Sequence, residues 1–298
     1  MSEAITVHRL SSPLGDWEMA LGTPTLALRP FVQGMYTGSV ERLPAPLRRL
    51  ELPHPGVVCI FDFGDGYRVR DARATAACAS RPLGSFVAGL FDSWVHVDAA
   101  GTSRCVQVNL TPLGAMRILG LPLGELVNRS VPMESLPGAS DLRLSDCLDD
   151  AGTWEARFAA VEAVLLARVA GARALPPLVE SAWRQLHAEG GAIDVATLAR
   201  SLGCSRRHLG TLLQAHTGLS PKMLARLIRF DAAVTLLARM AARGAANGTA
   251  QRLSSIAHRC RYYDHAHMDR DFREFAGMSP SSYLSLRHPR FGALLVGD

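Results

Sequence analysis

Ser205-Arg206-Arg207-His208-Leu209, followed by Gly218-Leu219-Ser220-Pro221, is matched 59 residues further on by Asp264-His265-Ala266-His267-Met268, followed by Gly277-Met278-Ser279-Pro280. Leu198-Ala199 and Ile256-Ala257 precede these stretches, at an offset of 58. Each copy predicts a short helix, a turn and a second helix rich in Arg, His and Gln. The repetition therefore predicts two helix-turn-helix modules in one chain.

Capping residues mark where the helices of the repeats begin. Asp194 and Ser205 are expected N-caps of the two helices in the first module. Pro221 suits the first position of a long connecting helix over Lys222–Arg243, which would set how the two modules face each other. The Gly-rich segment Gly244–Thr249 is expected to be a loop before the second repeat.

The second helix of each module has an apolar face and a polar, mostly basic one. The apolar positions expected in the core are Leu209, Leu212, Leu213, Met268, Phe272 and Phe275. An exposed helix of this kind fits the DNA major groove, where side chains read base edges. The outward side chains expected to read bases are Arg206, Arg207, Thr211, Gln214, His265, Asp269, Arg270 and Arg273.

Side chains beside these helices are expected to contact DNA phosphates, which fixes register but carries no sequence information. The residues expected in this role are Arg200, Ser205, Lys222, Arg226, Arg259 and Arg261. Two rigidly joined modules would lie about 34 Å apart, in successive major grooves on one face of the duplex. One chain could then read a bipartite site.

The charge distribution agrees with a polyanion-binding C-terminal half. Residues 176–298 contain 16 Arg/Lys and 9 Asp/Glu, a net charge of +7, whereas residues 1–175 have a net charge of −2. Such an asymmetry suggests that the two halves do different work. Charge alone does not decide the matter, because a basic surface can also be merely well solvated.

The N-terminal half has the character of β-structure. Gly56–Phe63 and Tyr67–Arg70 flank Gly64-Asp65-Gly66 and predict a hairpin, and Gly84–Phe91 with Trp94–Val97 predicts a second. Cys105–Leu110 alternates with a period of two. Several short strands at this spacing indicate a barrel or a sandwich.

Helices are expected after this region, at Leu113–Leu119 and Trp154–Val169. The apolar face of the longer helix could pack on the domain's own sheet or form a homodimer interface. Pro176-Pro177 then marks a domain boundary. The expected fold is α+β, with a β-rich barrel-like or jelly-roll-like domain and trailing helices over residues 1–175. Residues 176–298 would form an all-α domain of two helix-turn-helix modules joined by a long helix.

The ordered motifs of residues 177–287 resemble the AraC/XylS family of bacterial transcription regulators. They comprise Ser-x-x-His-Leu and Gly-Leu-Ser-Pro in the first repeat, and Arg229, Ala233 and Leu236-Leu237 in the connecting helix. The second repeat has Ile-Ala, then Asp-x-x-His-Met-x-Arg-x-Phe-Arg, then Gly-Met-Ser-Pro-x-x-Tyr-Leu. The resemblance implies a seven-helix DNA-binding domain, with RNA polymerase as a partner.

The resemblance also implies particular base-reading positions, which are Arg207, Gly210, Thr211, His265, Ala266 and Arg270 in this sequence. The chain departs from the family pattern at three of its positions. Thr211 replaces a common Arg, Gly210 has no side chain, and Arg261 stands where the second turn usually has Gly. Base reading by the first module would then rest mainly on Arg207 and Gln214.

The N-terminal half resembles, more loosely, the sensor part of one subgroup of these regulators. The similarity lies in Phe86-Val87-Ala88-Gly89 and Thr111-Pro112-Leu113-Gly114-Ala115. It implies a small β-barrel-like domain for effector binding or dimerisation, and it supplies no ligand. Trp17, Trp94 and Trp154 could line an effector pocket, although large aromatic side chains mostly serve cores.

Catalytic and metal-binding constellations are not expected. His258, Cys260, His265 and His267 match no usual zinc spacing, and the repeat already explains His267 through His208. His96 lacks a partner histidine two residues away, because Asp98 holds that position. The sequence also contains no glycine-rich phosphate loop and no Gly-x-Ser-x-Gly elbow.

The remaining features concern the compartment. Six scattered cysteines without a C-x-x-C pair are expected to be reduced thiols. No apolar run reaches the length of a membrane span, and the first residues do not resemble a secretory signal, so we expect a cytoplasmic protein without a membrane partner.

These observations predict a sequence-specific transcription regulator that binds double-stranded DNA and is not an enzyme, with no cofactor and no metal. The N-terminal domain would modulate DNA binding through a small-molecule effector or through homodimerisation. One alternative is a DNA-binding protein whose N-terminal domain serves only for dimerisation or partner docking. Another, an N-terminal enzyme fused to a DNA-binding domain, lacks a catalytic constellation.

Overall fold

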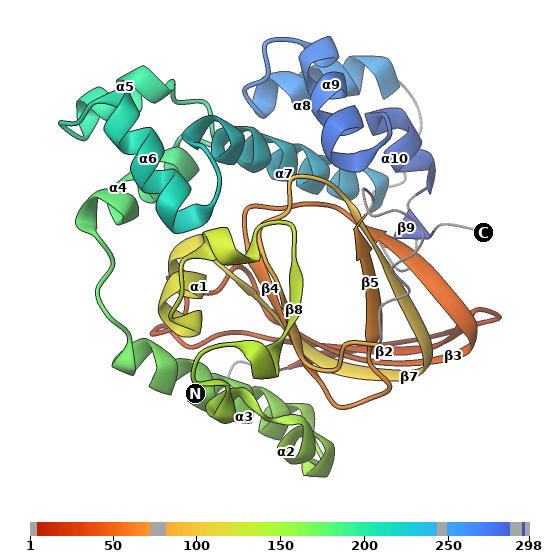
Figure 1. Cartoon of the computed structure of the whole chain (residues 1–298). Helices are drawn as coiled ribbons and strands as arrows, with labels where there is room; N and C mark the ends of the chain where they lie inside the picture. The colour runs from red at the N-terminus through yellow and green to blue at the C-terminus, as the bar shows by residue number, and fades with distance from the viewer. Residues whose placement is uncertain (1–4, 72–81, 243–248, 287–293, 296–298) are drawn as a thin grey trace.

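Two long antiparallel strands, β3 (Tyr36–Glu51) and β7 (Val95–Leu110), form the centre of a nine-stranded sheet (Figure 1). The computed structural model describes residues 5–71, 82–242, 249–286 and 294–295. The order of the main path is β1-β2-β3-β7-β4-β6-β8, with β5 beside β7 and β9 beside β3. The other strands are β1 (Thr6–Ser12), β2 (Gly15–Gly22), β4 (Val57–Asp62), β5 (Tyr67–Asp71), β6 (Phe86–Ala88), β8 (Ser130–Pro132) and β9 (Leu294–Leu295).

The two predicted hairpins are wrong, although their strands exist. β4 and β5 do not pair with each other, because both lie along the same edge of β7, β4 opposite Cys105–Leu110 and β5 opposite Val95–Ala99. The intervening segment follows β7 as well, since the Phe63 amide donates to Arg104 O (2.9 Å). β6 pairs with β4 and β8 rather than with β7. Strand propensity is local, whereas the long β7 offers an edge that captures both neighbours.

Successive residues of β7 face opposite sides of the sheet, as strand geometry requires. Val106, Val108 and Leu110 are fully buried in the main core. Gln107 and Asn109 point to the other side, into a cavity. The alternation in Cys105–Leu110 thus separates a packed face from a hollow one.

Helix α3 (Trp154–Gly171) covers the packed face of the sheet, and its apolar side is buried within the chain. Trp154 and Phe158 have ring centroids 5.8 Å apart, and Trp154 Nε1 donates to Glu18 Oε1 at 2.8 Å. Only glycine fits beneath these rings at Gly22 and Gly38, where an added side-chain carbon would collide with them. The intramolecular interpretation of this helix is therefore confirmed, and this face is not free to form a dimer.

Helices follow the sheet in sequence. The short helix at Leu113–Leu119 is confirmed as α1 (Pro112–Leu119). The others before the helical domain are η1 (Leu123–Leu126), η2 (Met133–Ser135), η3 (Ala139–Leu142) and α2 (Ser145–Asp150). Within the described part of the chain, no helix is both long and apolar enough to cross a membrane.

The C-terminal region is helical (Figure 1). Its elements are α4 (Pro177–Ala188), α5 (Val195–Ser201), α6 (Arg206–Thr217), α7 (Pro221–Ala242), α8 (Thr249–Arg259), α9 (His265–Ala276) and α10 (Pro280–Leu286). The long connecting helix is confirmed as α7. The loop expected at Gly244–Thr249 falls mostly outside the described residues. The α+β class and the order of a β-rich part before a helical part are confirmed.

Candidate nucleic-acid interface and sheet cavity

The first repeat folds into a helix-turn-helix whose ends are capped by its own side chains. Asp194 Oδ2 accepts hydrogen bonds from the Ala196 and Thr197 amides, and Ser205 Oγ accepts one from the His208 amide at 3.1 Å. Both predicted N-caps are therefore confirmed. Between the helices, Gly203 takes a left-handed conformation with φ of +65°, which glycine adopts without steric cost.

The second repeat reproduces this geometry. Asp264 caps α9 by accepting from the His267 amide at 2.7 Å. Arg261 takes φ of +61°, the conformation of Gly203 in the first repeat. The backbone hydrogen bonds that close the two turns correspond as well. The Cys204 amide donates to Ala199 O at 3.0 Å, and the Tyr262 amide donates to Ala257 O at 2.9 Å. Arg261 thus occupies a backbone position that favours glycine.

The inner faces of α6 and α9 are packed into a common core. Leu209, Leu213, Met268, Phe272 and Phe275 are fully buried, and Leu212 is half-buried. On the outer faces, the exposed residues among the predicted base readers are Arg206, Arg207, Thr211, Gln214, Ala266, Arg270 and Arg273, whereas His265 and Asp269 are half-buried. Gly210 is half-buried. Polar side chains therefore cover the outer faces of both helices.

Three of the predicted base readers, Gln214, Asp269 and Arg273, already have partners within their own helix or its cap. Gln214 Nε2 donates to Gly218 O at 2.6 Å. Arg273 pairs with Asp269 at 2.7 Å, one helical turn away. Arg207 and Arg270 are exposed and stand on the N-terminal halves of α6 and α9.

Arg226, for which a phosphate contact is predicted, is engaged in ion pairs within the helical domain. Its guanidinium bonds to Asp271 (2.7 Å) and Glu274 and lies over the Phe275 ring, 4.8 Å from the centroid. The side chain is 18% exposed, and these carboxylates raise its pKa. The other predicted phosphate contacts, Arg200, Ser205, Lys222, Arg259 and Arg261, are all exposed.

Helix α7 joins the two modules through buried aromatic and ionic contacts. Phe230 lies 4.8 Å from Phe272 and 5.1 Å from Phe275, measured between ring centroids. Arg229 donates to Gly191 O beside the first module and lies over the Tyr262 ring of the second. The modules are therefore braced against one helix rather than linked by a loose segment.

The β-rich domain contacts both modules. The C-cap Gly218 of α6 packs on Gly124 and Val127, and Gly277 of α9 packs on the Trp94 ring. An ion pair of 3.1 Å joins Arg117 to Glu180 of α4. β9 pairs with β3, with Leu294 opposite Leu50 and Leu295 opposite Arg49.

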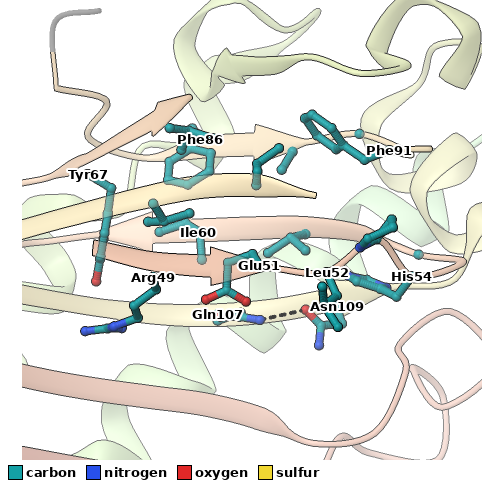
Figure 2. Close-up of a pocket in the computed structure, with 18 of the residues that line it drawn as sticks. Arg49, Glu51, Leu52, His54, Ile60, Tyr67, Phe86, Phe91, Gln107 and Asn109 are labelled. Carbon is teal, nitrogen blue, oxygen red and sulfur yellow. Dashed lines mark hydrogen bonds between the residues drawn. The ribbon is translucent and has the colours of Figure 1, made fainter. Parts of the chain in front are cut away.

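A cavity of about 350 Å³ lies on the hollow face of the sheet (Figure 2). That volume falls at the lower end of the range for ligand pockets. Phe86 and Phe91 lie on the opposite side from Gln107 and Asn109, as Figure 2 shows. None of Trp17, Trp94 and Trp154 lines it; Trp154 is buried in the core, and Trp94 packs on Gly277.

Charged groups are concentrated on β3 at the cavity wall. Arg49 forms an ion pair with Glu41, which is 6% exposed. Glu51 lines the cavity with an exposed side chain, and desolvation by the surrounding protein atoms raises the pKa of its carboxyl. Burial also lowers the pKa of His54 to about 4, so this imidazole is neutral at pH 7. Sequence reasoning missed these residues, although Arg49 and Glu51 alternate along a strand as residues of one face do.

The described residues include no cluster of three or more His, Cys, Asp and Glu residues that could hold a metal. His267 stacks edge-on against Tyr262, with centroids 5.2 Å apart. Cys59, Cys105, Cys147, Cys204 and Cys260 are free thiols, and Cys78 lies outside the described residues.

Comparison with known families finds matches over two regions of the chain. Residues 198–285 match the model of a helix-turn-helix domain, and residues 22–132 match a domain of unknown function, DUF6597. No curated protein sequence matches the chain significantly.

Among solved structures, the chain is similar to ToxT from Vibrio cholerae. For ToxT of strain O395 the identity is 11% and the TM-score 0.44, covering 84% of this chain and 97% of that one. For a second crystal form of ToxT the identity is 13% and the TM-score 0.46, covering 88% of this chain and 99% of that one. For ToxT of strain SCE256 bound to an unsaturated fatty acid, the identity is 10% and the TM-score 0.43, covering 82% of this chain and 96% of that one.

The two capped modules, their bracing helix and the match over residues 198–285 define a DNA-binding transcription regulator. The ordered motifs of both repeats resemble those of the AraC/XylS family, and the matched domain contains both of them.

Proposed function

We propose that the protein reads a bipartite DNA site, with α6 and α9 in successive major grooves of one duplex face. The bracing of both modules on α7 carries this proposal. A 22-residue helix is about 33 Å long, close to the distance between successive major grooves on one face. Because the two modules are rigidly held at this distance, we expect them to dock on one DNA duplex together rather than independently.

Within this mode, Arg207 and Arg270 are the principal base readers, because arginine forms two hydrogen bonds to a guanine edge. The other proposed base readers are Arg206, Thr211, Gln214, His265, Ala266, Asp269 and Arg273. Arg200, Ser205, Lys222, Arg259 and Arg261 would contact phosphates. Arg226 instead serves the joint between α7 and α9.

The β-rich domain would modulate this docking by binding a small-molecule effector in the sheet cavity. Two observations support the proposal. The cavity has polar and apolar walls, as ligand pockets do. The segment between Gly89 and Val95 contributes Phe91 and Ser93 to the cavity and Trp94 to the contact with Gly277. A ligand that moved this segment would act on the second module.

The rest of the proposal concerns organisation and partners. The division falls at residues 175 and 176, between the β-rich part with its trailing helices and the DNA-binding part. The protein would act in the cytoplasm, with RNA polymerase as a partner and no catalytic activity of its own. In the alternative version, the β-rich domain binds no ligand and only dimerises or docks a partner.

The test is selection of bound sites from random duplex DNA by the full-length protein, followed by titration at several salt concentrations. Two half-sites about one helical turn apart, bound far more tightly than random DNA, are expected. A single half-site would show that only one module reads bases, and no motif with a steep salt dependence would leave a nonspecific polyanion binder. Concentration-dependent dimerisation without any metabolite-induced thermal shift would favour the alternative version.

A further inference from the structure

The two walls of the sheet cavity differ in chemistry. β3 and β7 supply polar side chains, among them Glu51, Gln107 and Asn109. The opposite side presents the apolar side chains of Phe86 and Phe91, and Ile60 lies between the two walls, beside Gln107 on the neighbouring strand (Figure 2). A ligand that fills this space needs one polar end and one apolar body, because each unmatched polar group would remain desolvated.

The charges on the polar wall do not cancel. Arg49 is engaged with Glu41 in an ion pair. No described residue forms a hydrogen bond or an ion pair with the Glu51 carboxylate. His54 adds no positive charge at pH 7, since burial holds its pKa at about 4. Among the described lining residues, one carboxylate is therefore in excess.

One neutral polar group that lines the cavity also lacks a partner among the described residues. Ser93 is 1% exposed, and its buried hydroxyl has no hydrogen-bond partner among the described residues. Gln107 Nε2 donates to Asn109 Oδ1 at 2.9 Å, which fixes both amides on the polar wall. Buried polar atoms are nearly always satisfied in native proteins, so a partnerless hydroxyl in a cavity points to a missing partner.

We propose that this cavity binds a small organic cation, an amine with an apolar body, whose ammonium group pairs with Glu51. The proposal deepens the effector role proposed above and rests on it. Three ammonium hydrogens can serve the carboxylate and neighbouring acceptors together. The apolar body would lie against Ile60, Phe86 and Phe91.

Other ligand chemistries fit less well. A carboxylate ligand would face both Glu51 and Glu41, while the single Arg49 guanidinium is paired with Glu41 and already attracts Glu51 as well. Two carboxylates in one cavity repel each other, more strongly than they would in bulk water. A neutral alcohol could bond to Ser93 or Gln107, but it would leave the excess carboxylate charge uncompensated.

The experiment uses three probes of nearly equal size and shape: phenethylamine, 2-phenylethanol and phenylacetate. Each is titrated calorimetrically into the full-length protein, with hexylamine as a probe of different shape. We expect an amine to bind and the alcohol and the acid to bind at least tenfold more weakly. Tighter binding of phenylacetate, equal binding of the alcohol, or no binding of either amine would overturn the proposal.

Two variants assign the binding to Glu51. Glu51→Gln should weaken amine binding by about tenfold to a hundredfold, the usual value of a charge-assisted bond, and leave binding of the alcohol unchanged. Glu125→Gln makes the same chemical change at an exposed site outside the cavity and should change nothing. Equal amine affinity in Glu51→Gln and the wild type would overturn the assignment.

DNA binding is measured in the same samples, so that the two proposals can fail separately. If an amine binds through Glu51 but does not change the affinity for the selected DNA site, the proposed ligand class stands and the proposed effector role is wrong. If the protein binds DNA sequence-specifically but binds neither amine, only the proposed ligand class is wrong.

Discussion

Gly218 and Gly277 occupy the same position in the two repeats, and both lie against the β-rich domain. Each ends its recognition helix in the left-handed conformation, with φ of +72° and +67°. Gly218 meets Gly124 and Val127 near η1, and Gly277 meets the Trp94 ring. One domain therefore contacts both modules at equivalent places, which allows it to act on both through one kind of contact.

The first prediction concerns the contact of Trp94 with Gly277. Trp94→Ala removes the ring that covers the end of α9, so backbone amide exchange should accelerate at the end of α9 and the start of α10. Exchange in α6 should not change, because its contact is made by η1. Hydrogen exchange measured by mass spectrometry distinguishes the two helices. Equal acceleration in both modules would show that they are not contacted separately.

Arg261→Gly should stabilise the second module. A non-glycine residue in the left-handed conformation costs about 1 kcal/mol or more, and glycine removes most of this cost. Urea denaturation should show an unfolding free energy about 1 kcal/mol higher. Arg259→Gly is the matched control, because that residue is helical and exposed, and there the free energy should fall by a similar amount. A loss of stability in Arg261→Gly would contradict the strain.

Arg226 and Lys222 should separate stability from DNA contact. Arg226→Ala leaves Asp271, which is 2% exposed, without its cation, and the unfolding free energy should fall by about 3 kcal/mol. Lys222→Ala should leave stability unchanged and reduce the slope of log affinity against log salt by about one unit. The opposite pattern would restore Arg226 as a phosphate contact.

Arg270→Ala should weaken base preference rather than overall affinity. We expect discrimination at one or two base pairs to fall by about 1–3 kcal/mol in titrations of the selected site and its single-base variants. Random DNA provides the comparison. An equal loss on selected and random DNA would assign Arg270 to phosphate instead.

His54 should make stability fall in acid. Its folded pKa is about 4, below the usual value of 6.5, so the neutral imidazole contributes fully above pH 6.5. Between pH 6.5 and 4, His54 is protonated in the unfolded chain but still neutral in the folded chain. The unfolding free energy should therefore drop by about 1–3 kcal/mol over this range. Glu51, Glu41 and Arg49 line the same cavity; the raised pKa of Glu51 acts in the opposite direction, because the folded chain binds that proton more readily than the unfolded chain. The difference between the wild type and His54→Gln isolates the effect, and identical pH profiles would refute it.

The helix-turn-helix modules could be predicted in detail because their signals are local. Asp194, Ser205 and Asp264 cap helices that begin at the next residue, and the apolar spacing of α6 and α9 defines their buried faces. Arg261 stands where the family usually has Gly, and its positive φ explains why glycine suits that position.

The errors arose where distant segments meet. Asp65-Gly66 has the local chemistry of a hairpin turn, yet pairing with β7 decides where β4 and β5 lie. Arg226 has an outward basic character in sequence, but its partner Asp271 is 45 residues away. The cavity could not be predicted, because its wall combines β3 and β7, whose register depends on the whole sheet.

The pairing of β9 with β3 limits how the helical domain can move. The chain leaves the β-rich part after α3 and returns to it at Leu294 and Leu295, so the helical domain is supported at both ends. Together with the contacts at Gly218 and Gly277, this pairing gives the helical domain several separate attachments to the β-rich part. One of them lies on the strand that also carries Arg49 and Glu51, so a single strand both forms a wall of the cavity and holds the end of the chain.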